Sequence, residues 1–187
     1  MKVYLAGPDV FLPDAMAVGR RKQEICVRYG LTGLFPLDNG TNEAAGATGV
    51  PPSMQIFSGC IAMMEEADAV IAHLTPFRGA SADAGTVFEL GYMAARGKIC
   101  AAYTNRCDTY AGRTECAPGV APGGSGLANL DCDGHFIENF GLADNLMIVH
   151  ALDTFGHPIM VPDAEPEDIW RDLTLFEKCA AWIAGQR

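Results

Sequence analysis

The chain has 187 residues, of which 49% are hydrophobic and 19% are charged, and its formal net charge is -10. This length suffices for one domain with a buried core, and the composition argues against disorder. So negative a surface would repel a phosphate backbone, which leads us to set nucleic-acid binding aside. No apolar run is long enough to span a bilayer, and residues 1–11 lack the apolar stretch of a signal peptide, so we expect a cytoplasmic protein with no membrane partner.

The seven cysteines are odd in number and scattered along the chain, which indicates reduced thiols rather than a disulfide framework. Cys107, Cys116, Cys132 and His135 fall in one polar stretch and could be imagined as a zinc site. No CxxC pair occurs there, and the spacing misses the usual patterns of structural zinc. We therefore expect no metal.

Apolar strands and amphipathic helices alternate along the first hundred residues. Buried strands are predicted at residues 2–6, 31–36, 69–74 and 99–103. Helices are predicted at residues 14–29, from Ser53 onward, and at 87–98. We expect Met16, Ile25 and Val27 to contact the core, and Ser53 to cap its helix. Such alternation implies a parallel sheet with right-handed crossovers.

The pattern dissolves between residues 104 and 141 into Gly, Pro, Cys and Asn, and we expect a long irregular loop there. Such a loop could be a lid over a site or a disordered insertion, and the sequence leaves both open. Order resumes at residues 145–149, and a last helix is predicted at about residues 167–184. Because no repeat and no second domain are visible, we interpret residues 1–187 as a single domain.

Polar and glycine residues follow three of the predicted strands. Gly7 follows the first, Asp38 follows the second, and the loop after the third holds Arg78, Asp83 and Gly85. In an open parallel sheet, ligands bind beyond the carboxyl ends of the strands, where these segments converge. The sequence therefore predicts a ligand site at this edge.

Glu89 is the candidate nucleophile. It falls in the early turns of a helix, where the helix dipole favours negative charge, so we expect it to stay ionised. Asp83 could face the same cleft, and two carboxylates suit chemistry through an oxocarbenium-like transition state. A glutamate at a helix start is more often a solvated or capping residue, and Tyr4 is more often core than catalytic. A buried Tyr4 hydroxyl would still need a partner, which Glu89 could supply.

The sequence contains, in this order, the blocks YLAGPDVF, FPLDN, EADAVIAHLTPFRGASADAGTVFELGYMAARGK and FGLADNLM. In content and order these blocks resemble the nucleoside 2-deoxyribosyltransferases, most closely the trypanosomatid-type members, from Val3 to about Val149. The resemblance implies an α/β fold, a Rossmann-like (flavodoxin-like) three-layer sandwich with a mostly parallel five-stranded sheet. It also implies a double-displacement exchange, with retention and without a cofactor, between 2′-deoxyribonucleosides and free purine or pyrimidine bases.

The resemblance also implies roles for single residues. Glu89 corresponds to the nucleophile that forms the covalent deoxyribosyl intermediate, and Tyr4 to the tyrosine that orients it. Asp83 corresponds to the aspartate that grips sugar hydroxyls. Gly7 would let the base approach the backbone, and Asp38 is a candidate for base recognition.

Two further residues resemble ones that act between subunits. Asn145 and Met147 match residues that reach into a neighbouring subunit's site, the asparagine towards the sugar. A complete site would then require a homo-oligomer with shared active sites.

The sequence departs from the family's pattern at two positions. Many members carry an aspartate or asparagine, proposed to exchange a proton with the base, where this chain has Cys60. A thiol is a weak hydrogen-bond partner, so the base's proton could be handled instead by Asp38, by a water or by another group. His73 stands where an acidic residue is common. A strand histidine is usually structural, although the ordinary pKa of histidine would permit pH-dependent behaviour.

Two other functions stay open at this point. A hydrolase could use Glu89 with water as acceptor, as in the related deoxynucleoside 5′-monophosphate N-glycosidases. Arg78 could contribute to a phosphate pocket, but the loop at residues 7–11 is acidic and apolar, which disfavours a phosphate there. A non-catalytic nucleotide-sensing module of the same fold would not need the set of Tyr4, Asp83 and Glu89.

Overall fold

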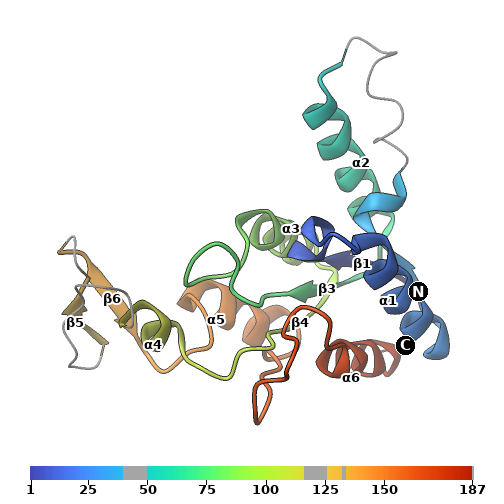
Figure 1. The fold of residues 1–187 in the computed structure, drawn as a ribbon. Coiled ribbons are helices and arrows are strands. Elements are labelled where there is room, and N and C mark those ends of the chain that lie inside the picture. The colour runs from blue at the N-terminus through green and yellow to red at the C-terminus, as the bar shows by residue number, and fades with distance from the viewer. Residues whose placement is uncertain (40–49, 116–125, 132–133, 187) are drawn as a thin grey trace.

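A four-stranded parallel sheet in the order β2-β1-β3-β4 forms the centre of the molecule (Figure 1). The computed structural model describes residues 1–39, 50–115, 126–131 and 134–186. The strands are β1 (Lys2–Ala6), β2 (Thr32–Leu34), β3 (Ala69–His73) and β4 (Ile99–Tyr103). Beyond β4, Gly156 and Met160 form parallel bridges to Cys100 and Tyr103, so a short fifth segment extends the sheet. The predicted mostly parallel sheet is therefore confirmed.

Helices cover both faces of the sheet and make it the middle layer of three (Figure 1). They are α1 (Ala15–Arg28), α2 (Pro52–Glu66), α3 (Ala84–Ala95), α5 (Leu146–Phe155) and α6 (Thr174–Ala184). Side chains alternate along a strand, so Val3 and Leu5 join the core beneath α1 and α6. Tyr4 and Ala6 join the core on the other face, beneath α3 and α5. All residues of β3 are buried, as expected for a strand covered on both faces.

The buried face of α1 differs from the predicted one. The buried residues of this helix are Ala15, Val18, Gly19, Lys22, Ile25 and Cys26. Their spacing of three and four residues defines one stripe, and Ile25 lies on it as predicted. Met16 is 44% exposed and Val27 is 69% exposed, because both fall off this stripe. The prediction that these two residues contact the core is wrong.

Two helices begin at residues other than the predicted ones. The first residue of α2 is Pro52, and Pro51 occupies the capping position, so Ser53 does not cap the helix. Proline suits the first helical position because its φ is already helical and it has no N–H to satisfy. The last helix, α6, begins at Thr174 instead of about residue 167. The Asp168 carboxylate accepts hydrogen bonds from the backbone N–H groups of Trp170 and Arg171 at 3.0 and 3.1 Å, which holds a turn there instead.

The stretch at residues 104–141 contains regular structure, contrary to the prediction of one irregular loop. It includes α4 (Tyr110–Glu115) and the strands β5 (Gly126–Leu130) and β6 (Phe136–Asn139). The two strands pair with each other as an antiparallel hairpin and not with the main sheet. The helix α4 and the hairpin lie together at one side of the molecule, beyond α5 (Figure 1). Cross-strand pairing of this kind is not visible in a composition rich in glycine and asparagine.

The described residues bear on the metal and membrane predictions only in part. Cys116 and Cys132, two members of the imagined zinc set, lie outside the described residues. Among the residues that are described, no group of three or more His, Cys, Asp or Glu side chains could hold a metal ion. Within the same part of the chain, no helix has both the length and the apolar character needed to cross a membrane.

Candidate functional site

Tyr4 and Glu89 meet between β1 and α3. Tyr4 is fully buried in β1, and its hydroxyl donates a hydrogen bond of 2.6 Å to Glu89 Oε1. Glu89 lies in the second turn of α3, which begins at Ala84. Its other carboxylate oxygen, Oε2, has no hydrogen-bond partner among the described residues. One oxygen of Glu89 is thus held in place while the other remains available to a ligand.

The protonation of Glu89 differs from the sequence prediction. Burial raises its pKa, the hydrogen bond from Tyr4 lowers it, and the charge of Asp83 raises it, to about 7 in total. A pKa near 7 leaves this carboxylate about half ionised at neutral pH, because desolvation opposes the ionised form that the sequence predicts. A carboxyl group with a pKa near neutrality is typical of functional sites.

Asp83 determines where α3 begins. It is the N-cap residue, and its Oδ2 accepts hydrogen bonds from Thr86 N at 2.9 Å and Thr86 Oγ1 at 3.0 Å. Its Oδ1 has no partner among the described residues, so the same carboxylate can cap the helix and bind a ligand. Its charge raises the pKa of Glu89, and a shared role of the two carboxylates at one ligand stays a prediction.

Cys60 of α2 completes this group. It is half-buried, and it interacts with both the Tyr4 hydroxyl and Glu89. Burial raises the pKa of the thiol, its interaction with the Tyr4 hydroxyl lowers it, and the charge of Glu89 raises it, with a net rise. The thiol is therefore protonated at neutral pH, and burial and the neighbouring carboxylate also raise the pKa of the Tyr4 hydroxyl. Both groups can donate a proton to a hydrogen bond.

Gly7 and Asp38 lie at the carboxyl ends of β1 and β2. A Cβ atom at Gly7 would approach Asp9 Oδ2 to 2.5 Å and His73 Cβ to 2.8 Å, so close packing already requires glycine here. Asp38 is exposed on a 3₁₀ turn, Pro36–Asn39, and its Oδ2 accepts a hydrogen bond of 2.5 Å from Gln23 Nε2. Neither position contradicts a role on the base side of the site, and both roles stay predictions.

Asn145 and Met147 lie at the start of α5, apart from the pair of Tyr4 and Glu89. Asn145 is the N-cap of this helix, and its Oδ1 accepts a hydrogen bond from Met147 N at 3.0 Å. Its Nδ2 donates to both carboxylate oxygens of Glu138 in the hairpin, at 2.8 and 3.0 Å. Met147 is 71% exposed. Its side chain points away from the core of its own chain and is accessible to a neighbouring subunit. The role of Met147 in a neighbouring subunit's site stays a prediction.

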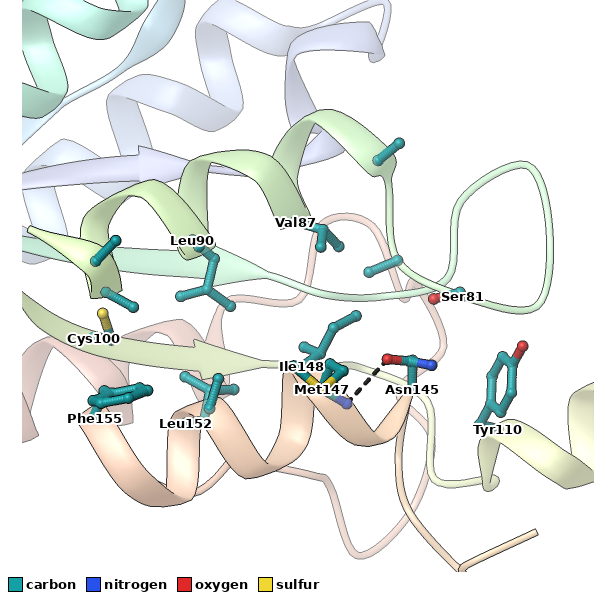
Figure 2. Close-up of a pocket in the computed structure, with 16 residues that line it drawn as sticks. Ser81, Val87, Leu90, Cys100, Tyr110, Asn145, Met147, Ile148, Leu152 and Phe155 are labelled. Carbon is teal, nitrogen blue, oxygen red and sulfur yellow. Dashed lines mark hydrogen bonds between the residues drawn. The ribbon is translucent and has the colours of Figure 1, made fainter. Parts of the chain in front are cut away.

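A groove of about 900 Å³ separates α3 from α5. Figure 2 shows Val87 and Leu90 of α3 on one side and Ile148 and Leu152 of α5 on the other. Asn145 stands near one end of the groove. Its lining is mostly apolar, which is unusual for a surface in contact with water.

The sequence did not indicate a buried charged cluster formed by Asp9, Lys22 and His73. All three side chains are about 1% exposed. Lys22 Nζ donates to Asp9 Oδ2, and His73 Nδ1 lies 3.0 Å from Asp9 Oδ1. Burial alone would raise the pKa of Asp9, but Lys22 and His73 hold it below its ordinary value. The helical spacing of Lys22 from Val18 and Ile25 could have predicted that this lysine is buried.

His73 is structural, in agreement with the more common role of a strand histidine. Its Nε2 lies 2.7 Å from Thr75 Oγ1, and its ring stacks on Tyr103 at 4.5 Å. Burial lowers its pKa despite the neighbouring Asp9. Arg78, the residue considered for a phosphate pocket, instead lies over the rings of Phe11 and Phe77 at 5.0 and 4.6 Å.

The parallel sheet and the Glu89 carboxylate beside it define the class of protein. It is a Rossmann-like α/β protein with a polar site among the loops at the carboxyl ends of its strands. A sequence profile of the family described as nucleoside 2-deoxyribosyltransferase matches residues 3–147. The chain belongs to the nucleoside 2-deoxyribosyltransferase family.

Three known proteins illustrate this relationship. The chain is similar to an uncharacterized protein of Schizosaccharomyces pombe, with 35% identity over 156 residues that cover 78% of this chain and 74% of the relative. It is similar in structure to a 2-desoxiribosyltransferase from Leishmania mexicana, with a TM-score of 0.66, 29% identity, and coverage of 100% of this chain and 98% of the other. A conserved protein from Enterococcus faecalis V583 shares the fold, with a TM-score of 0.58, 18% identity and 98% coverage of each chain.

Proposed function

We propose that this protein exchanges the base of 2′-deoxyribonucleosides through a covalent deoxyribosyl intermediate on Glu89. The hydrogen bond of 2.6 Å between Tyr4 and Glu89 Oε1 carries this proposal, because it orients a half-buried carboxylate and leaves Oε2 without a partner among the described residues. The family and the similarity to the Leishmania mexicana 2-desoxiribosyltransferase support it.

The reaction has two displacements at C1′ of the sugar. Glu89 Oε2 attacks C1′, the bond from C1′ to the base nitrogen breaks, and its electron pair leaves with the base, which takes up a proton. A nitrogen of the incoming base then attacks C1′, the bond to Glu89 breaks, and the incoming base loses a proton. Each displacement inverts C1′, so the configuration is retained overall.

Asp83 and Tyr4 support this chemistry without forming bonds to C1′. Asp83 Oδ1 accepts a hydrogen bond from a sugar hydroxyl, while Oδ2 continues to cap α3. Tyr4 stays protonated, since its pKa is raised, and keeps one oxygen of Glu89 fixed in both steps. Gly7 and Asp38 are assigned to the base side, with the base close to the Gly7 backbone.

We also propose that the site is completed by a second copy of this chain. Asn145 and Met147 stand on an exposed surface beside the apolar groove between α3 and α5. Other exposed apolar side chains lie on α2 and α3, namely Met54, Ile56, Phe57 and Phe88. Surfaces of this kind mark contacts between proteins.

Base exchange can be tested with deoxyinosine as donor and adenine as acceptor, with separation of the products by chromatography. The proposal predicts deoxyadenosine and hypoxanthine from the wild type. Free deoxyribose without a new nucleoside would show a hydrolase, and an unchanged mixture across several donors would favour a sensing module.

The nucleophile can be tested by Glu89→Ala, which should abolish turnover. Mass spectrometry of the acid-quenched wild type should show a deoxyribosyl adduct that is missing from Glu89→Ala. Glu24→Ala, which removes an exposed glutamate of α1, is the matched control and should behave as the wild type. Normal turnover by Glu89→Ala would refute the mechanism.

A further inference from the structure

Asp144 is a buried carboxylate with no part in the chemistry proposed above. It is 1% exposed and lies immediately before the N-cap of α5. Its Oδ1 accepts hydrogen bonds from Ser81 Oγ and, at 2.7 Å, from Asn145 N. Its Oδ2 accepts a hydrogen bond of 2.9 Å from Ala82 N. One carboxylate therefore joins the loop before α3 to the start of α5.

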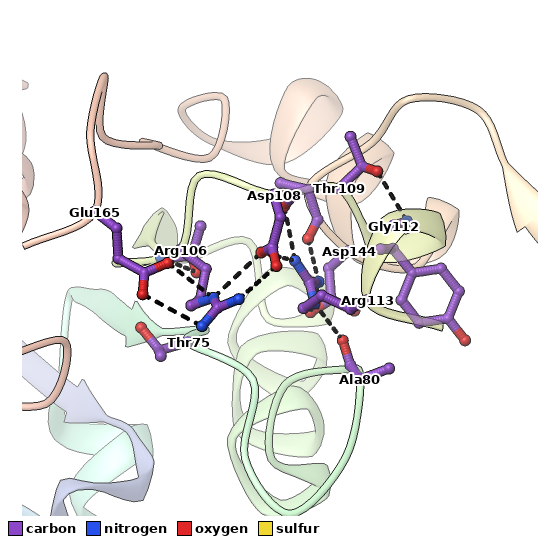
Figure 3. A network of polar contacts seen from close by, with 12 residues as sticks. Thr75, Ala80, Arg106, Asp108, Thr109, Gly112, Arg113, Asp144 and Glu165 are labelled. Atoms are coloured by element: carbon purple, nitrogen blue, oxygen red, sulfur yellow. Dashed lines mark hydrogen bonds and ion pairs between the residues drawn. The ribbon is translucent and has the colours of Figure 1, made fainter. Parts of the chain in front are cut away.

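Arg113 of α4 reinforces this junction (Figure 3). Its side chain is 7% exposed, and Nη2 lies 3.9 Å from Asp144 Oδ2. The guanidinium donates to the carbonyl oxygens of Ala80 at 2.7 Å and Ala143 at 2.6 Å. It also donates to the backbone carbonyl of Asp108 at 2.8 Å. A planar guanidinium in such contacts fixes several chain segments at once.

The two segments that Asp144 joins both end at proposed site residues. Ser81 and Ala82 directly precede Asp83, which we assign to the sugar in the chain's own site. Asn145 directly follows Asp144, and we assign it to the site of the neighbouring copy. We propose that Asp144 is a positioning residue that holds Asp83 for its own site and Asn145 for its neighbour's site. This inference rests on the proposed function and extends it, since one buried carboxylate then supports two active sites.

Asp144→Asn should displace one of the two segments that the carboxylate joins. Asparagine keeps the shape and one acceptor, but its NH₂ group would face an N–H donor, either Ala82 N or Asn145 N. One segment must then move away from its present position. Displacements of about 1 Å at a site can lower rates about 100-fold, so we expect kcat/KM to fall about 10- to 100-fold.

Hybrid oligomers separate the two roles. Chains with different affinity tags are co-expressed, and only assemblies that contain both chains are purified. Glu89→Ala paired with Asn145→Ala is the reference, because one of its sites combines an intact Glu89 with the partner's intact Asn145. Asp144→Asn paired with Glu89→Ala reports the effect on Asp83, since turnover then occurs beside the altered Asp144. Asp144→Asn paired with Asn145→Ala reports the effect on Asn145.

The inference predicts that both test hybrids are at least about 10-fold less active than the reference hybrid. Reference activity in either test hybrid would overturn the double role. If Asp144→Asn fails to fold, Ser81→Ala takes its place, because it removes one contact to the same carboxylate. Ser81→Ala should give a smaller loss of activity in both hybrids. Unchanged activity of Ser81→Ala in both hybrids would overturn the inference. Asp153→Asn, an exposed position on α5, is the matched control.

The failure of the proposed function would look different. A wild type that transfers no base refutes that function directly. An active wild type with an inactive reference hybrid refutes the shared site, and the inference with it.

Discussion

Tyr4→Phe tests how the hydrogen bond from Tyr4 controls the pKa of Glu89, the proposed nucleophile. The substitution deletes the hydroxyl that donates to Glu89 Oε1 at 2.6 Å and changes little else in a buried position. A hydrogen bond to a charged group contributes about 1.5–3 kcal/mol, and one pKa unit corresponds to about 1.4 kcal/mol. The pKa of Glu89 should therefore rise from about 7 to about 8–9. At pH 7 the ionised fraction should fall from about one half to between about 0.1 and 0.01, which lowers kcat/KM about 5- to 50-fold.

The measurement is the pH profile of kcat/KM for deoxyinosine with adenine as acceptor, from about pH 5 to about pH 10. The wild-type rate should rise with pH through about 7, since the proposed attacking species is the ionised carboxylate. Tyr4→Phe should lose most of its activity at neutral pH and recover much of it in alkali. Tyr29→Phe removes a hydroxyl that donates to Glu177 at 3.1 Å, far from Glu89, and serves as the control. An unchanged midpoint in Tyr4→Phe would refute the electrostatic reasoning.

Three further substitutions test the site and the core. Cys60→Asp places a further carboxylate beside Glu89, in addition to Asp83, so the midpoint of the kcat/KM profile should move upward, whereas the uncharged Cys60→Ser should leave it near the wild-type value. Lys22→Met leaves Asp9 charged and buried, so urea denaturation should show a loss of about 3–5 kcal/mol in the free energy of unfolding, with most of it restored by adding Asp9→Asn. Gly19→Ala puts a Cβ atom 2.5 Å from the ring of Phe35, so it should lower the free energy of unfolding by about 1–3 kcal/mol. This loss is expected even though alanine favours helices more than glycine does, and a gain in stability would contradict the packing.

The central strands were predictable because their signal is local. Residues 99–103 are predicted as a strand and form β4 in the structure. A short apolar run in a chain that alternates strands and helices is typical of a buried strand. The inward face of α1 was less predictable. Lys22 interrupts its apolar stripe, and only the partners Asp9 and His73, distant in sequence, make its burial tolerable.

The features of the candidate site that follow from the order of the strands were predictable from the sequence. The features that depend on side-chain packing were not. Strand order brings Tyr4 and Glu89 to adjacent elements, and the contact between them follows from that placement. The raised pKa of Glu89 depends on how much water the surrounding side chains exclude, which no spacing in the sequence reveals. Asp144 was missed for a related reason. An aspartate beside an asparagine in a loop is ordinarily a turn residue, and only the folded chain shows that two of its donors come from residues 81 and 82.

The loop after β1 has different groups of polar side chains on the two faces of the sheet. Tyr4 points towards α3 and its Glu89, whereas the buried side chains of Lys22 and His73 lie on the opposite face, with α1 and β3. Asp9 connects the two arrangements, because it sits two residues beyond Gly7, and a Cβ atom at Gly7 would strike both Asp9 and His73. The charged cluster thus holds the loop on one face of the sheet, and the proposed nucleophile, Glu89, lies on the other face. Because the two sets of charges are separated by the sheet, Lys22→Met should reduce stability without moving the pH midpoint of kcat/KM, and Tyr4→Phe should move that midpoint.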